Sequence, residues 1–328
     1  MSILVVGGAG YIGSIMTEQL LGHDEEVVVL DNLSRGHKDA VHPKAVFIQG
    51  DMGDETLVKR LLKEYSCNLV MHFSALSLVG ESVQQPLTYY ENNVAKGIAL
   101  VKAMLAAGVN RLVFSSTAAV YGEPKHVPIP EEAPTVPVNP YGRSKLQFEH
   151  FLADCAGAEG LSYIALRYFN AAGAGDRFGE DHHPETHLIP IVLQTALLQR
   201  NTVTIYGNDY PTKDGTCIRD YIHVVDLARA HLLAMNRLRT NANINEVYNL
   251  GNNLGFSVLE IIKVAEKVTG VKIPYTIGAR RSGDPAALVA SSKRIKSMLG
   301  WNPKHPDIED IISSAWQWHK QHPEGYGR

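Results

Sequence analysis

The glycine-rich turn after the first apolar run constrains the fold more than any other feature of the chain. The apolar residues 3–6 precede Gly7, Gly10 and Gly13, and a helical pattern continues to about Gly22. Glycines permit a tight turn and a close approach of a ligand to the backbone, and the N-terminus of the following helix attracts a pyrophosphate. A strand, a glycine turn and a helix in this order therefore predict a dinucleotide-binding unit.

Short apolar runs alternate with helical patterns through the first half of the chain. The apolar runs span residues 3–6, 27–30, 46–48, 69–72, 112–115 and 162–167, and the helical patterns span residues 14–21, 55–65, 92–107 and 141–156. This alternation predicts an α/β fold, a doubly wound parallel Rossmann sheet with right-handed crossovers. The second run ends at Asp31, about where an acidic residue meets the hydroxyls of an adenosine ribose.

The length of 328 residues exceeds the usual size of a single core, and the periodicity weakens after about residue 170. We therefore expect a cofactor-binding Rossmann domain over residues 1–170. A smaller mixed α/β lobe for the substrate is expected over residues 171–328. A segment near residues 220–250 is expected to cross back to the first domain.

Composition and charge argue against nucleic-acid-binding, membrane-spanning and disulfide-rich proteins. A formal net charge of −3 offers no basic surface for nucleic acid or an anionic membrane, and no apolar run approaches the length of a membrane span. The first predicted strand begins at residue 3, which leaves no room for a signal peptide. Cys67, Cys155 and Cys217 are odd in number, widely spaced and without a C-x-x-C motif, which argues against a disulfide framework or a zinc site. We therefore expect a cytoplasmic enzyme.

A tyrosine and a lysine four residues apart add chemistry to the predicted fold. Tyr141 and Lys145 share one face of a predicted helix. An isolated phenol is a poor base at neutral pH, but a fixed ammonium nearby favours the phenolate. The pair can therefore exchange a proton with a sugar or alcohol hydroxyl while the dinucleotide accepts a hydride. Together with the glycine turn, it predicts an oxidoreductase-type active site.

Motifs along nearly the whole chain carry a more specific resemblance. They are G-G-A-G-Y-I-G-S (7–14), L-D-N-L (30–33), M-H-F-S (71–74), V-G-E-S-V (79–83), F-S-S-T (114–117), P-Y-G-R-S-K (140–145), R-Y-F-N (167–170), D-G-T-C-I-R-D-Y-I-H-V (214–224) and Y-N-L-G (248–251). With these motifs and its G-x-x-G-x-x-G spacing, the chain resembles the UDP-glucose 4-epimerase (UDP-galactose 4-epimerase) family of extended short-chain dehydrogenases/reductases.

The resemblance implies an isomerase that interconverts UDP-glucose and UDP-galactose in galactose metabolism, with a retained NAD. NAD would take a hydride from C4 of the hexose, the 4-keto sugar would rotate, and the hydride would return to the opposite face. Tyr141 matches the base of this family. Lys145 would bind the nicotinamide ribose and depress the phenol pKa, and Thr117 matches the hydroxyl that orders the 4-OH group.

The resemblance also implies two sets of binding residues. The expected cofactor contacts are Gly7, Gly10, Tyr11, Ile12, Gly13, Asp31, Asn32, Leu33, Ser34, Arg35, Gly36, Asp51, Met52, Phe73, Ser74, Ala75, Leu76, Ser77, Asn92, Thr117, Tyr141, Lys145 and Phe169. The expected substrate contacts are Thr117, Tyr141, Asn170, His187, Leu188, Thr204, Ile205, Tyr206, Arg219, Arg281, Asp284 and Leu288. The arginines match the pyrophosphate-binding residues of the family, and Asp284 matches the residue at the uridine ribose.

Three positions vary within this family. Ser77 stands where some relatives use a lysine at the pyrophosphate, so cofactor retention must rely more on backbone N–H groups. His187 replaces an asparagine seen in some relatives. Leu288 occupies a position that walls the sugar pocket, where relatives with tyrosine resemble enzymes confined to UDP-glucose and UDP-galactose, and those with cysteine also accept N-acetylated sugars.

Other functions compete with an epimerase. A 4,6-dehydratase needs an acid pair beside Thr117, where this chain has Ala118 and Ala119. A non-catalytic NAD-sensing protein on the same fold need not keep Thr117, Tyr141 and Lys145 together. Histidines in the loop 182–187 resemble metal ligands by type, namely His182, His183 and His187 together with Glu185, but the family mechanism uses no metal and we expect none. We expect a homodimer, in which the predicted helices pair with a second copy as they do in relatives.

Overall fold

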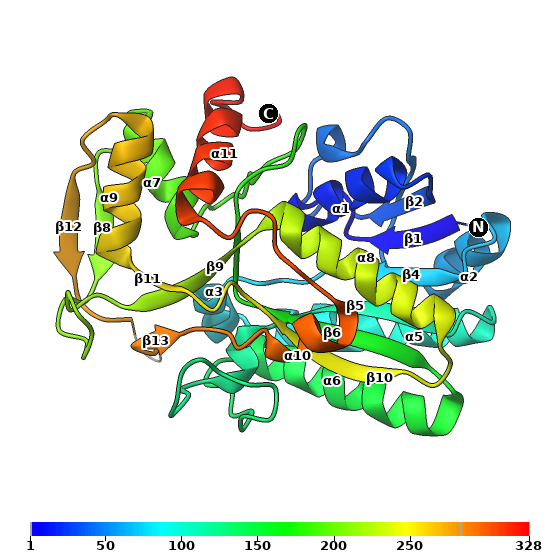
Figure 1. Ribbon diagram of the computed structural model, residues 1–328. Helices are drawn as coiled ribbons and strands as arrows, with labels where there is room; N and C mark the ends of the chain where they lie inside the picture. Colours follow the sequence, from blue (N-terminus) through cyan, green and yellow to red (C-terminus); the bar gives the residue numbers. More distant parts are fainter. Residues whose placement is uncertain (1, 282–283, 328) are drawn as a thin grey trace.

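A seven-stranded parallel sheet forms the centre of the computed structural model, which describes residues 2–281 and 284–327 (Figure 1). The strands lie in the order β10-β6-β5-β4-β1-β2-β3, and all neighbouring pairs are parallel. Their bounds are β1 (Ser2–Val6), β2 (Glu26–Asp31), β3 (Val46–Gln49), β4 (Leu69–His72), β5 (Arg111–Thr117), β6 (Ser162–Tyr168) and β10 (Asn245–Leu250). Because each of β1 to β6 contains one of the predicted apolar runs, the predicted parallel α/β sheet is confirmed.

Alternate residues of the central strands pack against helices on opposite faces of the sheet. The helices are α1 (Tyr11–Gly22), α2 (Glu55–Glu64), α5 (Lys96–Ala106), α6 (Pro140–Glu159) and α8 (Val224–Thr240). Ile3 and Val5 of β1 share a buried cluster with α1 and α8, whereas Leu4 and Val6 share another with α2, α5 and α6. Burial on both faces explains why these strands read as continuous apolar runs in the sequence.

The helix predicted over residues 92–107 begins earlier and is interrupted. α3 (Val79–Gln84) and α4 (Pro86–Tyr90) lead into a π-helical turn, η2 (Glu91–Ala95), which continues into α5. Asn93 in this turn is buried, and its side chain bonds the backbone N–H and carbonyl of Leu76 and the hydroxyl of Ser144. The wider π-helical turn directs this polar side chain into the interior. The apolar periodicity of the sequence does not predict such a turn.

Smaller sheets and further helices build the rest of the described chain. β9 (Ile218–His223) pairs with β7 (Asn170–Ala172), β11 (Gly255–Ser257) and β13 (Ala287–Leu288), and β8 (Val203–Tyr206) pairs with β12 (Tyr275–Gly278). α7 (Leu188–Ala196), α9 (Val258–Thr269) and α11 (Ile308–Gln321) share a separate apolar cluster. α10 (Lys293–Leu299) lies beside β10, and the turns η1 (Lys38–Ala40) and η3 (Ala118–Tyr121) complete the described elements.

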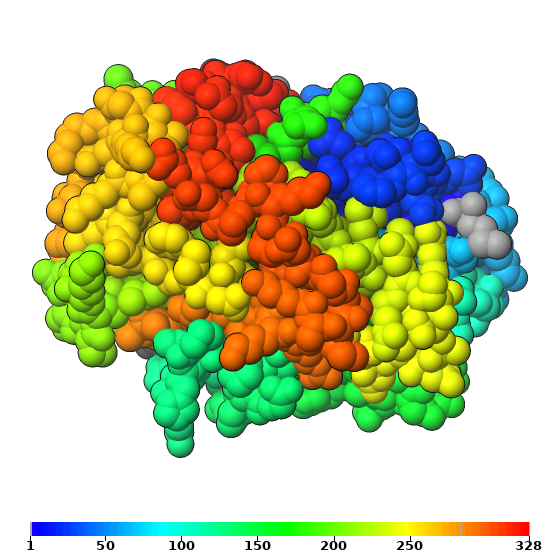
Figure 2. Space-filling view, in the orientation of Figure 1, coloured from blue at the N-terminus to red at the C-terminus, as the bar shows by residue number. Residues whose placement is uncertain are grey.

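The chain crosses between the two groups of sheets. β9 belongs to a small sheet, but α8 and β10 follow it and return to the seven-stranded sheet, where β10 pairs with β6. Figure 2 shows this segment in yellow against the blue N-terminal region. The crossing is made by residues 218–250, and the domain division predicted from the sequence stays a prediction.

Two further observations concern the described chain as a whole. Over residues 2–281 and 284–327, each helix lacks either the length or the apolar character that a membrane crossing requires. Cys67, Cys155 and Cys217 are free thiols, and Cys67 is buried in the core.

Candidate active site

A pocket of about 390 Å³ lies at the carboxyl ends of the central strands. Its wall includes the glycine turn after β1, the ends of β4 and β5, the start of α6 and the loop that leads to α7. β1 lies between β2 and β4, so the strand order reverses at this point of the sheet. Open parallel sheets bind their ligands at such a reversal, which makes this pocket the candidate site.

The glycine turn offers both space and hydrogen-bond donors. Gly7 has a φ of +82°, and a Cβ there would lie 2.5 Å from the backbone nitrogen of Ser74. α1 begins after Gly10 without a side-chain cap. The N–H groups of an uncapped first turn and the positive end of the helix dipole together bind phosphate. The turn therefore fits the pyrophosphate of a dinucleotide.

Asp31 ends β2 at the wall of the pocket. Its carboxylate accepts hydrogen bonds from the backbone N–H groups of Ala9 at 3.0 Å and Leu33 at 2.8 Å. Burial raises the pKa of Asp31, and these two hydrogen bonds oppose the rise. The carboxylate is thus fixed beside the glycine turn, where an acidic residue meets the ribose hydroxyls of a bound dinucleotide.

Arg35 connects two other segments across the pocket. Its guanidinium lies 2.6 Å from the Glu81 carboxylate of α3 and donates a hydrogen bond to the carbonyl of His183 at 3.1 Å. Sequence analysis did not include Glu81 among the site residues, although it lies in the V-G-E-S-V motif. Its role depends on a partner distant in sequence, which the motif alone does not identify.

Thr117, Tyr141 and Lys145 meet at the end of the pocket between β5 and α6. Asn139 caps the N-terminus of α6 with its side chain, which places Tyr141 in the first turn and Lys145 in the next. The Lys145 ammonium donates a hydrogen bond to the carbonyl of Ser115 at 2.7 Å. A phenol, a hydroxyl and an ammonium therefore share one buried corner of the site.

Burial dominates the acid–base properties of this corner. Burial raises the pKa of Tyr141, and a hydrogen bond with the Thr117 hydroxyl opposes the rise. Burial also lowers the pKa of Lys145 to about 7, and the Glu149 carboxylate opposes that change. The resemblance assigns the lowering of the phenol pKa to Lys145, whereas in this structure the group that acts in that direction is Thr117.

Most of the expected cofactor contacts line the pocket, and three lie outside its wall, namely Leu33, Asp51 and Met52. Asp51 forms an ion pair with Lys96 at 2.7 Å and accepts a hydrogen bond from Asn32 at 3.0 Å. Met52 is buried in the apolar cluster of α2 and α5. An adenine contact by Asp51 and Met52 stays a prediction.

The expected substrate contacts form two groups. Those that line the pocket are Thr117, Tyr141, Asn170, His187 and Leu288. Those outside its wall are Leu188, Thr204, Ile205, Tyr206, Arg219, Arg281 and Asp284. Ile205 is buried in the apolar cluster of α7, α9 and α11, so its side chain faces the core.

The second group has its own contacts. Arg219 forms an ion pair with Asp284, and the guanidinium of Arg281 lies 3.9 Å from the centre of the Tyr206 ring. Leu288 of β13 pairs with Arg219 of β9, which links these arginines to the pocket wall. The charged groups are therefore adjacent to the pocket rather than inside it.

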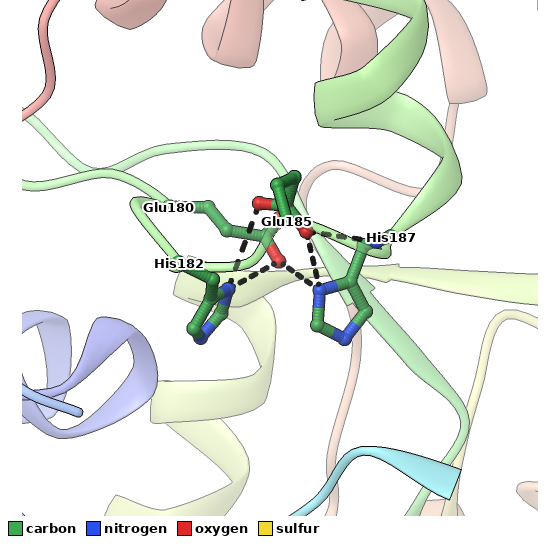
Figure 3. A group of neighbouring side chains, drawn as sticks. All are labelled: Glu180, His182, Glu185 and His187. Atoms are coloured by element: carbon green, nitrogen blue, oxygen red, sulfur yellow. Dashed lines mark hydrogen bonds and ion pairs between the residues drawn. The ribbon is translucent and has the colours of Figure 1, made fainter. Parts of the chain in front are cut away.

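Two glutamates and two histidines cluster on the loop before α7 (Figure 3). This loop cluster consists of Glu180, His182, Glu185 and His187, whose donor atoms all lie within 4.8 Å of one another. These residue types could hold a metal ion, but ion pairs between the carboxylates and the imidazoles already engage the same atoms. His183, which resembles a ligand by type, contacts Asp181 instead. Sequence analysis missed Glu180, because a glutamate in a polar loop has no signal of burial.

Comparisons with known proteins agree with this geometry. Residues 3–251 match the family described as the NAD dependent epimerase/dehydratase family. The chain is 55% identical over 328 residues to the UDP-glucose 4-epimerase of Halalkalibacterium halodurans, covering 99% of this chain and 98% of the relative. The UDP-glucose 4-epimerase of Brucella ovis in complex with NAD superimposes with a TM-score of 0.93, at 44% identity over 97% of this chain and 98% of that chain. The enzyme of Bifidobacterium longum in complex with NAD+ and UDP gives a TM-score of 0.94, at 39% identity over 99% and 100% of the two chains.

Proposed function

Because this chain belongs to the NAD dependent epimerase/dehydratase family, we propose that it interconverts UDP-glucose and UDP-galactose. The protein is an isomerase that inverts C4 of the hexose, with NAD as a retained cofactor. The single observation that carries this proposal is the meeting of Thr117, Tyr141 and Lys145 with the glycine turn in one pocket.

The first half of the pocket fits NAD. The uncapped start of α1 offers N–H groups to the pyrophosphate, and the fixed carboxylate of Asp31 accepts hydrogen bonds from the adenosine ribose. Lys145 lines the far end of the pocket, where it would hold the nicotinamide ribose. When bound, NAD accepts the hydride from C4 and later returns it.

Thr117, Tyr141 and Lys145 handle the transfer of the proton that accompanies the hydride. Tyr141 removes the proton of the 4-hydroxyl as a base and returns it to the inverted alcohol. Thr117 forms a hydrogen bond with the Tyr141 phenol, and it orders the 4-hydroxyl of the sugar between the two side chains. Lys145 lies one turn away on α6 and is held by the Ser115 carbonyl, while burial raises the pKa of the Tyr141 phenol and the hydrogen bond from Thr117 is what lowers it. Because the proton and the hydride both return to the sugar, the net redox change is zero.

The pocket lacks the acid that a dehydratase requires beside Thr117. Ala118 and Ala119 occupy the wall at that point, and neither can move a proton. Of the carboxylates that line the described pocket, Glu81 pairs with Arg35 and the others belong to the cofactor turn or to the loop cluster. This arrangement favours epimerisation over elimination of water.

The UDP half of the substrate is proposed to bind near the two arginines. A guanidinium fork pairs with phosphate oxygens. Arg219 forms an ion pair with Asp284 and lies beside Leu288 of the pocket wall, and Arg281 precedes Asp284 by three residues. If a diphosphate replaced Asp284 as the partner of Arg219, the Asp284 carboxylate would become free to bind the uridine ribose. The nucleotide would then lie outside the sugar pocket, with Leu288 between them.

One incubation tests the proposed function. The purified protein is mixed with UDP-galactose without added cofactor, and the nucleotide sugars are separated by chromatography. We expect UDP-glucose to accumulate to equilibrium and the denatured protein to release NAD. Unchanged UDP-galactose with NAD-loaded protein would contradict the proposed substrate.

We also propose that two copies associate through the helices beside the pocket. Val79, Val83, Leu87 and Ile98 are exposed apolar residues of α3, α4 and α5, and Leu87 is 84% exposed. Apolar side chains gathered on neighbouring helices favour burial by a partner. Light scattering after gel filtration should give the mass of a dimer, and Leu87→Glu should shift the protein toward the monomer.

The free thiols favour a reducing compartment, so we propose that the protein is located in the cytoplasm.

A further inference from the structure

The loop cluster places two buried carboxylates side by side. The side chains of Glu180 and Glu185 are 6% and 3% exposed, although they belong to a loop rather than to a helix or strand. Two carboxylates at such close range repel each other unless cations compensate them. The histidines of the cluster are the groups in contact with both.

Each imidazole is paired through its Nδ1 atom (Figure 3). Nδ1 of His187 lies 2.9 Å from Glu180 Oε1 and 2.9 Å from Glu185 Oε1. Nδ1 of His182 lies 3.2 Å from Glu180 Oε1 and 3.7 Å from Glu185 Oε2. Glu185 is held further by the backbone N–H groups of Thr186 and His187. At these distances Nδ1 of each ring lies within ion-pair range of both carboxylates, and two protonated rings would balance the two negative charges.

The acid–base properties agree with this geometry. Burial opposes a charged imidazole, yet Glu180 and Glu185 together raise the pKa of His182 to about 9. Burial opposes the charge of His187 as well, but the same carboxylates raise its pKa well above the usual value. The two carboxylates therefore favour the protonated form of both rings.

The cationic edges of the cluster face the pocket. His182 and His187 both line its wall, and they are more exposed than the carboxylates behind them, at 25% and 40%. Because Nδ1 of each ring points at a carboxylate, Nε2 points the opposite way, and it forms no hydrogen bond within the described residues. Each ring therefore retains one N–H donor for a ligand.

His182 lies next to α1, the helix that follows the glycine turn. Its ring packs edge-on against Tyr11, the first residue of α1, with ring centres 6.2 Å apart. The other cations of the described pocket wall are engaged elsewhere, since Arg35 pairs with Glu81 and Lys145 bonds the Ser115 carbonyl. His182 is thus the cation with an unused donor beside the N-terminus of α1.

We propose that His182, held as an imidazolium between Glu180 and Glu185, donates to the pyrophosphate of the cofactor at the N-terminus of α1. The glutamates are positioning residues that act through His182. A charge-assisted hydrogen bond to a phosphate oxygen is stronger than a neutral one, so the loop before α7 secures the cofactor from the side opposite the glycine turn. This inference rests on the NAD part of the proposed function.

The rate of NAD release tests the inference. Purified NAD-loaded protein is diluted into an excess of an NAD-consuming enzyme, and the free NAD is followed with time. We expect His182→Gln to release NAD about tenfold faster than the unmodified protein, which corresponds to the loss of one charge-assisted hydrogen bond. His150→Gln, at an exposed histidine of α6 outside the pocket, should leave the rate unchanged.

A second variant separates positioning from folding. Glu180→Gln keeps the His182 ring but removes one of its carboxylate partners, so the imidazolium should lose its proton at a lower pH. The groups that face His182 are Glu180, Glu185 and His187 on its own loop and Tyr11 of α1. We expect the pH at which NAD release accelerates to fall in this variant, and an unchanged pH profile would overturn the proposal.

Other results would also overturn it. They are release from His182→Gln at the unmodified rate, weaker binding of UDP to the variant with NAD release unchanged, or one equivalent of tightly bound metal in the purified protein. The last two would assign the cluster to the substrate diphosphate or to a metal ion. Failure of the proposed function has a different signature, because the unmodified protein would then lack NAD or turnover.

Discussion

Glu149 of α6 and Arg167 of β6 form an ion pair at 2.5 Å, with side chains only 4% and 8% exposed. Glu149 also accepts a hydrogen bond from the Ser116 hydroxyl, and Arg167 donates to the phenol of Tyr121 at 2.9 Å. The pair lies two turns along α6 from Tyr141. It therefore fixes the catalytic helix against strands that end at the pocket.

Glu149→Gln should destabilise the protein by about 3–5 kcal/mol, because it leaves the buried Arg167 guanidinium without its counter-charge. Urea unfolding measures this change. Glu55→Gln is the control, since it breaks an exposed pair with Lys102 and should cost less than about 1 kcal/mol. Equal effects of the two substitutions would contradict the structural importance of the buried pair.

Tyr141→Phe should lower kcat by at least about a hundredfold, the typical scale for the loss of a general base. Fold and NAD content should change little, because phenylalanine keeps the aromatic ring and removes only the hydroxyl. Steady-state turnover of UDP-galactose measures the loss, with circular dichroism as the check on folding. Turnover near that of the unmodified enzyme would exclude Tyr141 as the base.

At Thr117, the hydroxyl rather than the side-chain shape should matter. Thr117→Val removes the group that bonds the phenol, whereas Thr117→Ser keeps it. We expect Thr117→Val to lose at least about tenfold in kcat and Thr117→Ser to retain most of it, within the range of general acid–base effects. Similar rates for both variants would show that the hydroxyl has no part in the reaction.

The purified protein should carry NAD and discriminate against NADP. The buried carboxylate of Asp31 would repel a 2′-phosphate, while it accepts hydrogen bonds from a ribose 2′-hydroxyl. Mass spectrometry of the cofactor released on denaturation gives the answer directly. Protein that carries mostly NADP would contradict the assigned role of Asp31.

Leu288 should restrict the size of the sugar. We expect a clear preference for UDP-glucose and UDP-galactose over N-acetylated UDP-sugars, because Leu288 lines the pocket and an N-acetyl group adds volume. Leu288→Cys should raise kcat/KM for UDP-N-acetylglucosamine, since removal of side-chain volume relieves overpacking. Comparable kcat/KM for both kinds of substrate in the unmodified protein would mean that another part of the wall sets the size.

The loop cluster should make stability depend on pH above neutrality. An unfolded histidine loses its proton near pH 6.5, whereas His182 keeps its proton in the folded protein up to about pH 9. Over this interval the folded state binds more protons, so the free energy of unfolding should fall as pH rises. Tm measured at a fixed excess of NAD should decline from pH 6.5 to about 9, and His182→Gln should flatten the decline. An equally steep decline in that variant would assign the slope to other groups.

The sequence predicts the sheet well because its strands are buried on both faces. The run 27–30 needs no information from distant residues to be recognised as a strand, and its extension to Asp31 follows from pairing with β3. The two-residue strand β13 has no such local signal. It forms because Ala287 and Leu288 pair with β9, a contact between distant parts of the chain.

The contacts of buried polar residues are harder to predict from the sequence. The loop cluster lies in a segment whose composition resembles a solvated loop, and the burial of Glu180 and Glu185 depends on how that loop folds onto α1 and α11. The catalytic pair could be located because Tyr141 and Lys145 are neighbours on one helix. Arg35 and Glu81 could not be paired in this way, because the contact joins the loop after β2 to helix α3, two segments that are distant in sequence.

Strand β10 covers the edge of β6, although α7, β8, β9 and α8 lie between the two strands in the sequence. A fragment that ends at residue 170 would leave that edge as a row of unpaired backbone groups, which is a template for association between chains. A chimera that keeps the seven-stranded sheet intact must therefore retain residues 224–250 from the same parent as the rest of that sheet.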